Sequence, residues 1–202
     1  MIAAIVLAAG ESSRMGSPKA RLPYPEPDGS ETSFLAHLLS VFETSRAAPI
    51  LVVFGHDADR LVSELDLGDA RALINRDYRD GMLSSLQMAV RALEIDERIS
   101  GALVCPVDHP DIDPNVVDTL IAHFEERPSA IVLPVHNGRR GHPVLFSRAV
   151  FPELLAAPKT VGARQVVWDH QEDLQEVEVP DAGVTIDIDT PSDYRAFRDK
   201  SN

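Results

Sequence analysis

Residues 5–19 read Ile5-Val6-Leu7-Ala8-Ala9-Gly10-Glu11-Ser12-Ser13-Arg14-Met15-Gly16-Ser17-Pro18-Lys19, an apolar run followed by a loop of small residues with two cations. The apolar run predicts a buried strand. Small residues let backbone N–H groups approach an anion closely, and Arg14 and Lys19 add fixed positive charge. The stretch therefore predicts a strand that leads into a polyphosphate-binding loop, with candidate contacts at Gly10, Ser12, Ser13, Arg14 and Lys19. A turn with two exposed cations is the alternative.

Two familiar phosphate-binding motifs do not fit this loop. A Walker A loop places a lysine directly after its second glycine, but Gly16 is followed by Ser17 and Lys19 comes later. A dinucleotide-binding fingerprint has three glycines, whereas only two are present here. The loop therefore belongs to another class of anion site.

Length and composition predict one compact domain over residues 1–202, because 44% of the 202 residues are hydrophobic. The single cysteine, Cys105, cannot form a disulfide within the chain. The first apolar run is too short to span a bilayer and has no basic segment before it. A net charge of −13 argues against a nucleic-acid or anionic-membrane partner. We expect a cytoplasmic enzyme.

Strand-like runs alternate with segments of helical period, which predicts an α/β fold with a mostly parallel, doubly wound sheet. Strands are predicted over residues 3–7, 50–54, 72–74, 102–107, 131–133, 144–146, 175–179 and 185–187. Helices are predicted over residues 34–43, 57–65, 84–93, 115–125, 149–155 and 163–169, and a last helix begins at Pro191 with Thr190 as N-cap. The proline-rich residues 23–29 predict a surface loop, with a lid over the ligand as the alternative.

A carboxylate, Asp108, follows the strand predicted over residues 102–107. Ligands of doubly wound sheets bind at the carboxyl ends of the strands, and one or two carboxylates are typical protein ligands of Mg²⁺. Asp108 is therefore a candidate metal ligand. The alternative is that Asp108 or Asp111 caps the next helix, although Asp113 is the better cap because Pro114 follows it.

A second pair of carboxylates, Asp187 and Asp189, comes near the end of the sequence. Residues two apart on a strand point to the same face, so the two side chains would share a side if the strand predicted there continued to Asp189. Adjacent carboxylates repel each other unless a cation lies between them. We expect a metal shared with Asp108, and the alternative is two independently solvated acids.

Two further stretches are candidate acceptor sites. Gly81, Ser84 and Ser85 stand at the start of a predicted helix, which suits a phosphate, with an ordinary helix cap as the alternative. Residues 139–143, Arg139-Arg140-Gly141-His142-Pro143, gather three potential cations that could bind an anionic acceptor, with a solvated turn as the alternative. Cys105 is expected in the core rather than as a nucleophile. No zinc-type ligand spacing occurs in the sequence.

Together these motifs resemble those of the MobA-like nucleotidyltransferases, and within them the MocA-type branch of molybdenum cofactor cytidylyltransferases. The first motif of the resemblance is Leu7-Ala8-Ala9-Gly10-x-Ser12-x-Arg14-Met15-Gly16-x-x-Lys19. The others follow in the family's order as Gly81-Met82-x-Ser84-Ser85-Leu86, Asp108-x-Pro110, Gly141-His142-Pro143 and Asp187-Ile188-Asp189-Thr190-Pro191. The resemblance runs nearly end to end.

The resemblance implies a Rossmann-like domain of the nucleotide-diphospho-sugar transferase type. It implies transfer of a nucleoside monophosphate from an NTP to a small phosphorylated acceptor such as molybdopterin, with release of pyrophosphate and with Mg²⁺, or Mn²⁺ in its place. Catalytic roles fall on Arg14, Lys19 and Asp108, and metal contacts on Asp108 with Asp187 or Asp189. Nucleotide contacts fall on Leu7, Ala8, Ala9, Gly10, Ser12, Ser13, Arg14, Lys19, Ser84 and Asp108. Acceptor contacts fall on Gly81, Ser85, Arg140, Gly141, His142 and Pro143.

One position bears on the choice of base. The guanylyltransferase branch tends to have a second glycine where this chain has Ala9, so the resemblance favours CTP. Two other functions stay open: an NAD(P)-dependent oxidoreductase, which the missing fingerprint weakens, and a non-catalytic insertion chaperone with a molybdenum enzyme as its client. The long proline-rich segment and His109, at a variable position of the Asp-x-Pro motif, leave the acceptor open.

Overall fold

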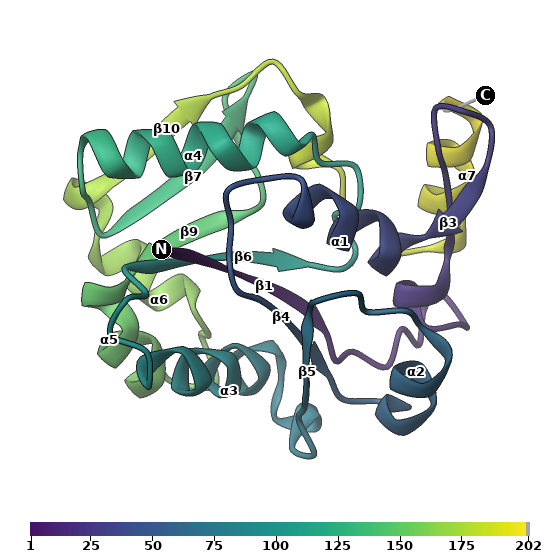
Figure 1. Cartoon of the computed structure of the whole chain (residues 1–202), viewed down its shortest axis with the longest axis horizontal. Helices are drawn as coiled ribbons and strands as arrows, with labels where there is room; N and C mark the ends of the chain where they lie inside the picture. The colour runs from purple at the N-terminus through teal and green to yellow at the C-terminus, as the bar shows by residue number, and fades with distance from the viewer. Residues whose placement is uncertain (201–202) are drawn as a thin grey trace.

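The first strand, β1 (Ile2–Ala8), lies in the middle of an eight-stranded sheet (Figure 1). The computed structural model describes residues 1–200 of the chain. Every residue of β1 is buried, and the strand pairs in parallel with β4 (Ile50–Phe54) and β6 (Gly101–Pro106). A strand that is apolar on both faces fits this central position, because helices cover both faces of a parallel sheet.

The strand order is β10-β7-β9-β6-β1-β4-β5, and β8 pairs with β7. The remaining strands of this sheet are β5 (Arg71–Ile74), β7 (Ile131–His136), β8 (Arg139–Arg140), β9 (Val144–Ser147) and β10 (Leu174–Glu178). Strands β8 and β9 run antiparallel to their neighbours, and the other pairs of the sheet are parallel. The predicted α/β fold with a mostly parallel sheet is confirmed.

Alternate residues of β1 enter two different cores. Ala4 and Val6 belong to a core shared with one set of helices, whereas Ala3, Ile5 and Leu7 belong to the core on the other face. The first set comprises α1 (Phe34–Glu43), α2 (Ala58–Glu64), α4 (Pro114–Glu126) and α7 (Pro191–Lys200). The second comprises α3 (Met82–Glu94), α5 (Phe151–Ala156) and α6 (Arg164–Asp169). The sheet is therefore doubly wound, as predicted.

The chain changes direction across the sheet between β1 and β6. It runs from β1 to β4 and β5 on one side, then returns through α3 to β6 on the other side. Leu7 and Pro106 are register partners, and the Val107 N–H donates to the Leu7 carbonyl at 3.0 Å. The loops after these two strands therefore leave the sheet side by side, at the place where ligands of doubly wound sheets bind.

Most predicted elements lie within a few residues of the observed ones, but the strand predicted over residues 185–187 is wrong. A short 3₁₀ helix, η5 (Ala182–Thr185), occupies the start of that segment. Backbone hydrogen bonds tie the two ends of this segment to loop residues, since the His142 N–H donates to the Val184 carbonyl and the Ile188 N–H donates to the Asp108 carbonyl. A Cβ at Gly183 would lie 1.5 Å from the Asp111 carbonyl oxygen, so this tight packing requires glycine.

The proline-rich segment is not only a loop. It begins in β2 (Pro23–Pro25), which forms a two-stranded antiparallel sheet with β3 (Glu31–Ser33). Tyr24 donates a hydrogen bond from its hydroxyl to Asp111 at 2.8 Å, and its ring stacks on His37 at 3.6 Å between centroids. The Tyr194 hydroxyl of α7 donates to the Pro23 carbonyl at 2.8 Å. These contacts hold the start of the hairpin against the body of the fold.

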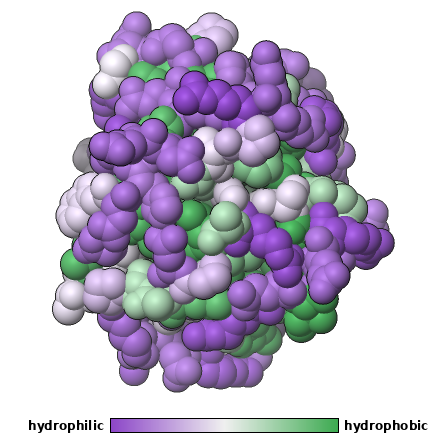
Figure 2. Space-filling model, turned by 90° about the vertical axis from the view of Figure 1, so that its left-hand side faces the viewer, coloured by the Kyte–Doolittle hydropathy of each residue, from purple (hydrophilic) through white to green (hydrophobic). Residues whose placement is uncertain are grey.

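The surface is mixed in character. The face in Figure 2 is covered mostly by hydrophilic side chains, with hydrophobic side chains between them. Among residues 1–200, no helix combines the length and apolar character needed to cross a membrane.

Cys105 is fully buried in β6, where burial raises the pKa of its thiol. Its expected place in the core is confirmed.

Candidate functional site

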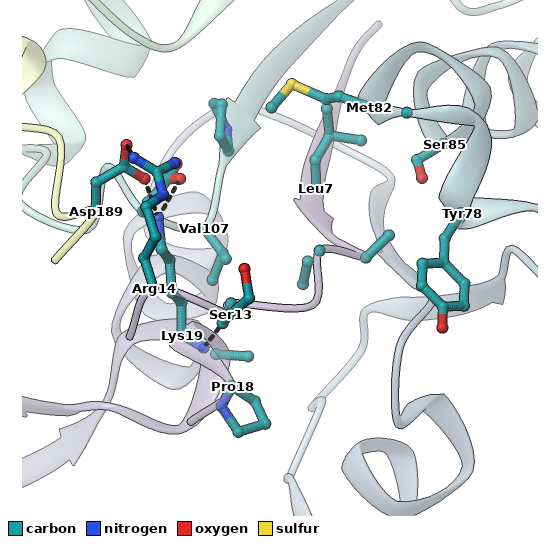
Figure 3. Close-up of a pocket in the computed structure, with 18 residues that line it drawn as sticks. Leu7, Ser13, Arg14, Pro18, Lys19, Tyr78, Met82, Ser85, Val107 and Asp189 are labelled. Carbon is teal, nitrogen blue, oxygen red and sulfur yellow. Dashed lines mark hydrogen bonds and ion pairs between the residues drawn. The ribbon is translucent and has the colours of Figure 1, made fainter. Parts of the chain in front are cut away.

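A cavity of about 330 Å³ opens at the carboxyl end of β1 (Figure 3). One side is formed by the end of β1 and the loop that follows it, down to Lys19. Tyr78, Met82 and Ser85 line the opposite side, and Asp108 and Asp189 close one end. The cavity therefore lies where the strand order changes direction, as predicted for the ligand.

The loop after β1 is held by its own hydrogen bonds. Ser12 has a left-handed backbone (φ +51°), and its carbonyl accepts hydrogen bonds from the N–H groups of Met15 and Gly16 at 2.9 and 3.0 Å. The Ser12 hydroxyl accepts a further one from the backbone N–H of Lys19 at 3.1 Å. The chain then enters the 3₁₀ helix η1 (Lys19–Arg21), which places the Lys19 side chain beside the cavity.

Lys19 and Arg14 converge on one carboxylate (Figure 3). Lys19 Nζ lies 2.5 Å from Asp189 Oδ1 and 2.9 Å from Asp108 Oδ2, and Arg14 Nη1 lies 2.8 Å from Asp189 Oδ2. The Lys19 side chain is 10% exposed and that of Arg14 is 68% exposed. Lys19 is therefore a fixed cation, whereas Arg14 reaches in from the surface.

The ionisation states of this cluster follow from its contacts. Burial opposes the charge on Lys19, but hydrogen bonds and attraction to Asp189 and Asp108 outweigh it and raise the pKa of Lys19. The hydrogen bond from Lys19 holds the pKa of Asp189 below its ordinary value. Lys19 and Asp189 are therefore both charged at neutral pH. The carboxylates keep the two cations, Lys19 and Arg14, beside the cavity.

Asp108, His109 and Asp187 form a second cluster beside the first. One potential ligand atom from each of the three lies within 4.8 Å of the others. Burial, followed by the charge of Asp108, raises the pKa of Asp187, and burial lowers the pKa of His109. Two carboxylates with a neutral imidazole form a donor set that fits a divalent cation.

A second cavity, of about 750 Å³, adjoins the first and shares Asp108, Asp189 and Arg14 with it. Its lining includes apolar side chains of β7 and β9, among them Leu133 and Phe146. Arg140 and Arg164 supply cations to the same lining. The combination suits a ligand with an apolar body and an anionic group.

Two of the three potential cations in residues 139–143 are arginines, and the third, His142, carries no charge near pH 7. His142 is partly buried and packs against His109, with 4.4 Å between the ring centroids, and burial lowers its pKa to about 4. It is therefore neutral near pH 7. Arg140 is exposed and donates to Glu176 at 2.6 Å. A Cβ at Gly141 would lie 2.2 Å from the Val184 carbonyl oxygen, so glycine permits this loop to pack on η5.

The two cavities gather most of the predicted site residues. Those lining the first are Leu7, Ala8, Ala9, Gly10, Ser12, Ser13, Arg14, Lys19, Gly81, Ser85, Asp108 and Asp189. Those lining the second include Arg140, Gly141, His142 and Asp187. Ser84 and Pro143 line neither cavity. The Ser84 hydroxyl donates to the Gly81 carbonyl at 2.8 Å and accepts from Asn75 at 2.8 Å, at the start of α3.

Tyr78 and Arg164 line the cavities but belong to none of the motifs identified in the sequence. Tyr78 stands in the 3₁₀ helix η2 (Tyr78–Asp80). A Cβ at Gly55 would lie 2.5 Å from Tyr78 Cβ and 2.7 Å from the Ala9 carbonyl oxygen. Gly55 therefore allows η2 to approach the end of β1. The role of this glycine can be recognised only once the fold is known.

The relatives of the chain include proteins named as transferases and one named as an oxidoreductase. Molybdenum cofactor cytidylyltransferase of Escherichia coli K12 is 29% identical over 199 residues, covering 97% of this chain and 95% of the relative. A probable molybdenum cofactor guanylyltransferase of Mycobacterium avium is 31% identical over 198 residues, covering 97% and 94%. Nicotine blue oxidoreductase of Paenarthrobacter nicotinovorans is 27% identical over 184 residues, covering 83% of each chain.

A solved structure agrees with the fold along the whole chain. The crystal structure of the Mycobacterium tuberculosis H37Rv protein Rv0371c in complex with manganese has a TM-score of 0.79 and 27% identity, covering 97% of each chain. The family model for the MobA-like NTP transferase domain matches residues 4–174. This match includes the loop after β1, Asp108 and the lining of both cavities up to Val167. The chain thus belongs to the MobA-like NTP transferase family and is a nucleotidyltransferase.

Proposed function

We propose that the chain moves a nucleoside monophosphate, with CMP from CTP favoured, onto a small phosphorylated acceptor such as molybdopterin and releases pyrophosphate. The observation that carries this proposal is the position of Asp108, which lines both cavities and pairs with Lys19 where they meet. A nucleotide in the first cavity and an acceptor in the second would bring their phosphates together at this junction.

In this reaction, an oxygen of the acceptor phosphate forms a bond to the α-phosphorus as the bond between the α-phosphorus and the bridging oxygen breaks. The acceptor oxygen is already ionised near neutral pH and needs no strong base. Catalysis then rests on positioning and charge neutralisation. Arg14 and Lys19 would bind the triphosphate and stabilise the negative charge that develops on pyrophosphate.

Asp108 and Asp187 are the residues proposed to hold the divalent cation, Mg²⁺ or Mn²⁺. That ion would neutralise phosphate charge when bound. We choose Asp187 rather than Asp189 as the second ligand because the carboxylate of Asp187 belongs to the cluster with Asp108. Asp189 instead pairs with Lys19 and Arg14. Asp189 would hold the two cations in place until phosphate oxygens take over their hydrogen bonds.

The preference for CTP rests on Ala9 at the edge of the first cavity. Its methyl group limits how closely a base can approach the backbone, and the related cytidylyltransferase and guanylyltransferase differ in the base they transfer. We expect an Ala9→Gly variant to lower the ratio of CTP to GTP turnover by a few-fold, on the order of 1 kcal/mol of discrimination. The wild-type ratio provides the reference.

We also propose that the chain forms one domain, acts in the cytoplasm and supplies its product to a molybdenum enzyme. The test is pyrophosphate release from each of the four NTPs in the presence of molybdopterin and either Mg²⁺ or Mn²⁺. Release that requires both CTP and the acceptor supports the proposal. Nucleotide binding with no release under any of these conditions would favour the insertion chaperone instead.

The relationship to nicotine blue oxidoreductase keeps a redox function as the second candidate. Titration with NADH and NADPH, followed by protein fluorescence, distinguishes the two. Saturable binding of a nicotinamide cofactor, together with no binding of any NTP, would replace nucleotidyl transfer by the redox function. Competition by CTP for the same site would instead support the transferase.

A further inference from the structure

We propose that His109 is a third protein ligand of the divalent cation and shifts the preference of the site from Mg²⁺ toward Mn²⁺, Co²⁺ or Zn²⁺. The inference rests on the proposed function only in taking the cation to be the one that serves nucleotidyl transfer. It concerns the one residue of the cluster whose donor atom is a nitrogen.

The geometry of the cluster supports three ligands on one ion. A ligand atom of His109 lies within 4.8 Å of carboxylate oxygens of both Asp108 and Asp187. Two donors at opposite positions of one ion stand at most about 4.5 Å apart, for metal–ligand distances of about 2.1–2.3 Å. Small side-chain movements therefore bring all three atoms into one coordination sphere.

The two segments that supply the ligands are tied together. Asp108 and His109 follow β6, whereas Asp187 follows η5. The Ile188 N–H donates to the Asp108 carbonyl at 3.0 Å, which fixes the backbone between the two segments. The proposed ligands therefore do not depend on a free loop, and the site is partly formed before any ion binds.

The imidazole of His109 has an unused donor atom. Nδ1 is buried and has no hydrogen-bond partner among residues 1–200. A buried polar atom without a partner costs on the order of 1–3 kcal/mol, and a bound cation would satisfy this one. His142 packs on the ring, with 4.4 Å between the centroids, and the ring forms a hydrogen bond with the backbone of Ile186. A hydrogen bond at the second ring nitrogen orients imidazoles that bind metals.

The ligand set has a chemical consequence. Mg²⁺ is bound through oxygen atoms and keeps several waters, whereas imidazole nitrogen is a good ligand for later first-row metals. Two carboxylates with one imidazole therefore favour Mn²⁺, Co²⁺ and Zn²⁺ relative to a site made of carboxylates alone. Asp108 lines both cavities, and His109 and Asp187 line the second, so an ion held here would be accessible to nucleotide and acceptor phosphates.

The most direct experiment detects the nitrogen itself. Pulsed electron paramagnetic resonance of Mn²⁺ bound to the full chain is recorded for the wild type, for His109→Gln and for His123→Gln, a control on the exposed face of α4. We expect ¹⁴N coupling in the wild type and the control and its loss in His109→Gln. Coupling that survives in His109→Gln, or is absent from the wild type, overturns the inference.

Affinity gives an independent readout. We expect His109→Gln to weaken Mn²⁺ and Co²⁺ binding by about 10- to 100-fold and Mg²⁺ binding by less than about threefold. Equal losses for all three ions would overturn the inference. If circular dichroism shows that His109→Gln does not fold, the wild-type chain labelled with ¹⁵N-histidine takes its place. We then expect the ¹⁴N coupling to Mn²⁺ to disappear. If ¹⁴N coupling persists after this labelling, His109 is not the ligand.

These results separate the inference from the proposed function. Nitrogen coupling in a protein that transfers no nucleotide would support His109 as ligand and overturn the transfer reaction. Transfer by a protein whose Mn²⁺ shows no nitrogen coupling would support the reaction and overturn His109 as ligand.

Discussion

The two cavities that meet at Asp108 are built in different ways. Most of one wall of the first comes from a single piece of chain, the end of β1 and its loop down to Lys19. The second takes its walls from strands β6, β7 and β9, from α3, and from residues around the start of α6. Small residues and main chain dominate the loop side of the first cavity, whereas side chains form the second.

This difference separates two kinds of recognition. A wall of small residues and fixed cations suits the triphosphate, which every NTP carries. A wall of side chains from distant segments can be shaped for one acceptor. Changes to the cations of the first cavity should therefore affect turnover of every nucleotide, and changes in the second should affect the acceptor alone. Substitutions in either cavity test that division, and a change at Asp108, which lines both, should affect nucleotide and acceptor alike.

The largest effect is expected for Asp108→Asn. This change removes a proposed metal ligand and the carboxylate beside Lys19, so turnover should fall by about 10³-fold or more with every NTP and acceptor. Pyrophosphate release measures it. Asp111→Asn, in the same loop, is the control because Asp111 binds Tyr24 rather than either cavity. Turnover of Asp108→Asn within tenfold of the wild type would contradict the proposed role.

Lys19→Met should be the next largest. It removes the buried cation of the first cavity, so the Kd for CTP should rise by about 10- to 100-fold while acceptor binding changes little. Isothermal titration measures both. Arg21→Met is the matched control, since Arg21 stands in the same 3₁₀ helix but pairs with Glu64. An equal loss of acceptor binding in Lys19→Met would remove the division between the cavities.

The free energy of unfolding at acid pH should depend on His142, in the lining of the second cavity. His142 has its pKa lowered from 6.5 to about 4 by burial and by the neighbouring His109, while Asp108 acts in the opposite direction. The unfolded chain therefore binds the proton first, and stability falls as the pH drops from about 6.5 toward 4. The free energy of unfolding should decrease by about 2 kcal/mol between pH 7 and pH 5 through this group.

Urea unfolding in a chelating buffer checks this prediction. His142→Gln should remove most of that decrease, whereas His123→Gln, on an exposed position of α4, should keep it. Parallel pH profiles for the wild type and His142→Gln would show that His142 is not buried in its neutral form.

The smallest effect is expected for Arg164→Gln. Arg164 is exposed at the second cavity, and no ion pair joins it to any carboxylate in the described part of the chain. Loss of its charge should raise the KM for a phosphorylated acceptor by about tenfold and leave the Kd for CTP unchanged. Arg91→Gln on α3 serves as control. A changed Kd for CTP would place Arg164 with the nucleotide instead.

The same contrast explains what could be predicted from the sequence. The loop after β1 is contiguous, so its residues and their cations were identifiable together, and period and apolar runs predicted the parallel strands. The strand expected over residues 185–187 was wrong because a 3₁₀ helix, η5, leads into it, with Gly183 packed against the Asp111 carbonyl and Val184 against Gly141, and no strand within residues 1–200 pairs with it. A local pattern does not contain those contacts.

Distant contacts account for the other differences. The sequence offered Asp187 and Asp189 as equal partners of Asp108, but only the fold separates a carboxylate in the cluster with His109 from one that pairs with Lys19. His142 was counted as a cation because its burial depends on packing against His109. Tyr78 reaches the first cavity through a close approach at Gly55, which no local motif encodes.

In the proposed reaction, the chain transfers the α-phosphorus of an NTP to an acceptor across the junction of the two cavities. This transfer can be followed with CTP labelled at the α-phosphorus and, in a parallel reaction, with CTP labelled at the γ-phosphorus. We expect the α label to appear in the acceptor product and the γ label in pyrophosphate. Transfer of the γ label to the acceptor, or no transfer of label from any NTP, would contradict it.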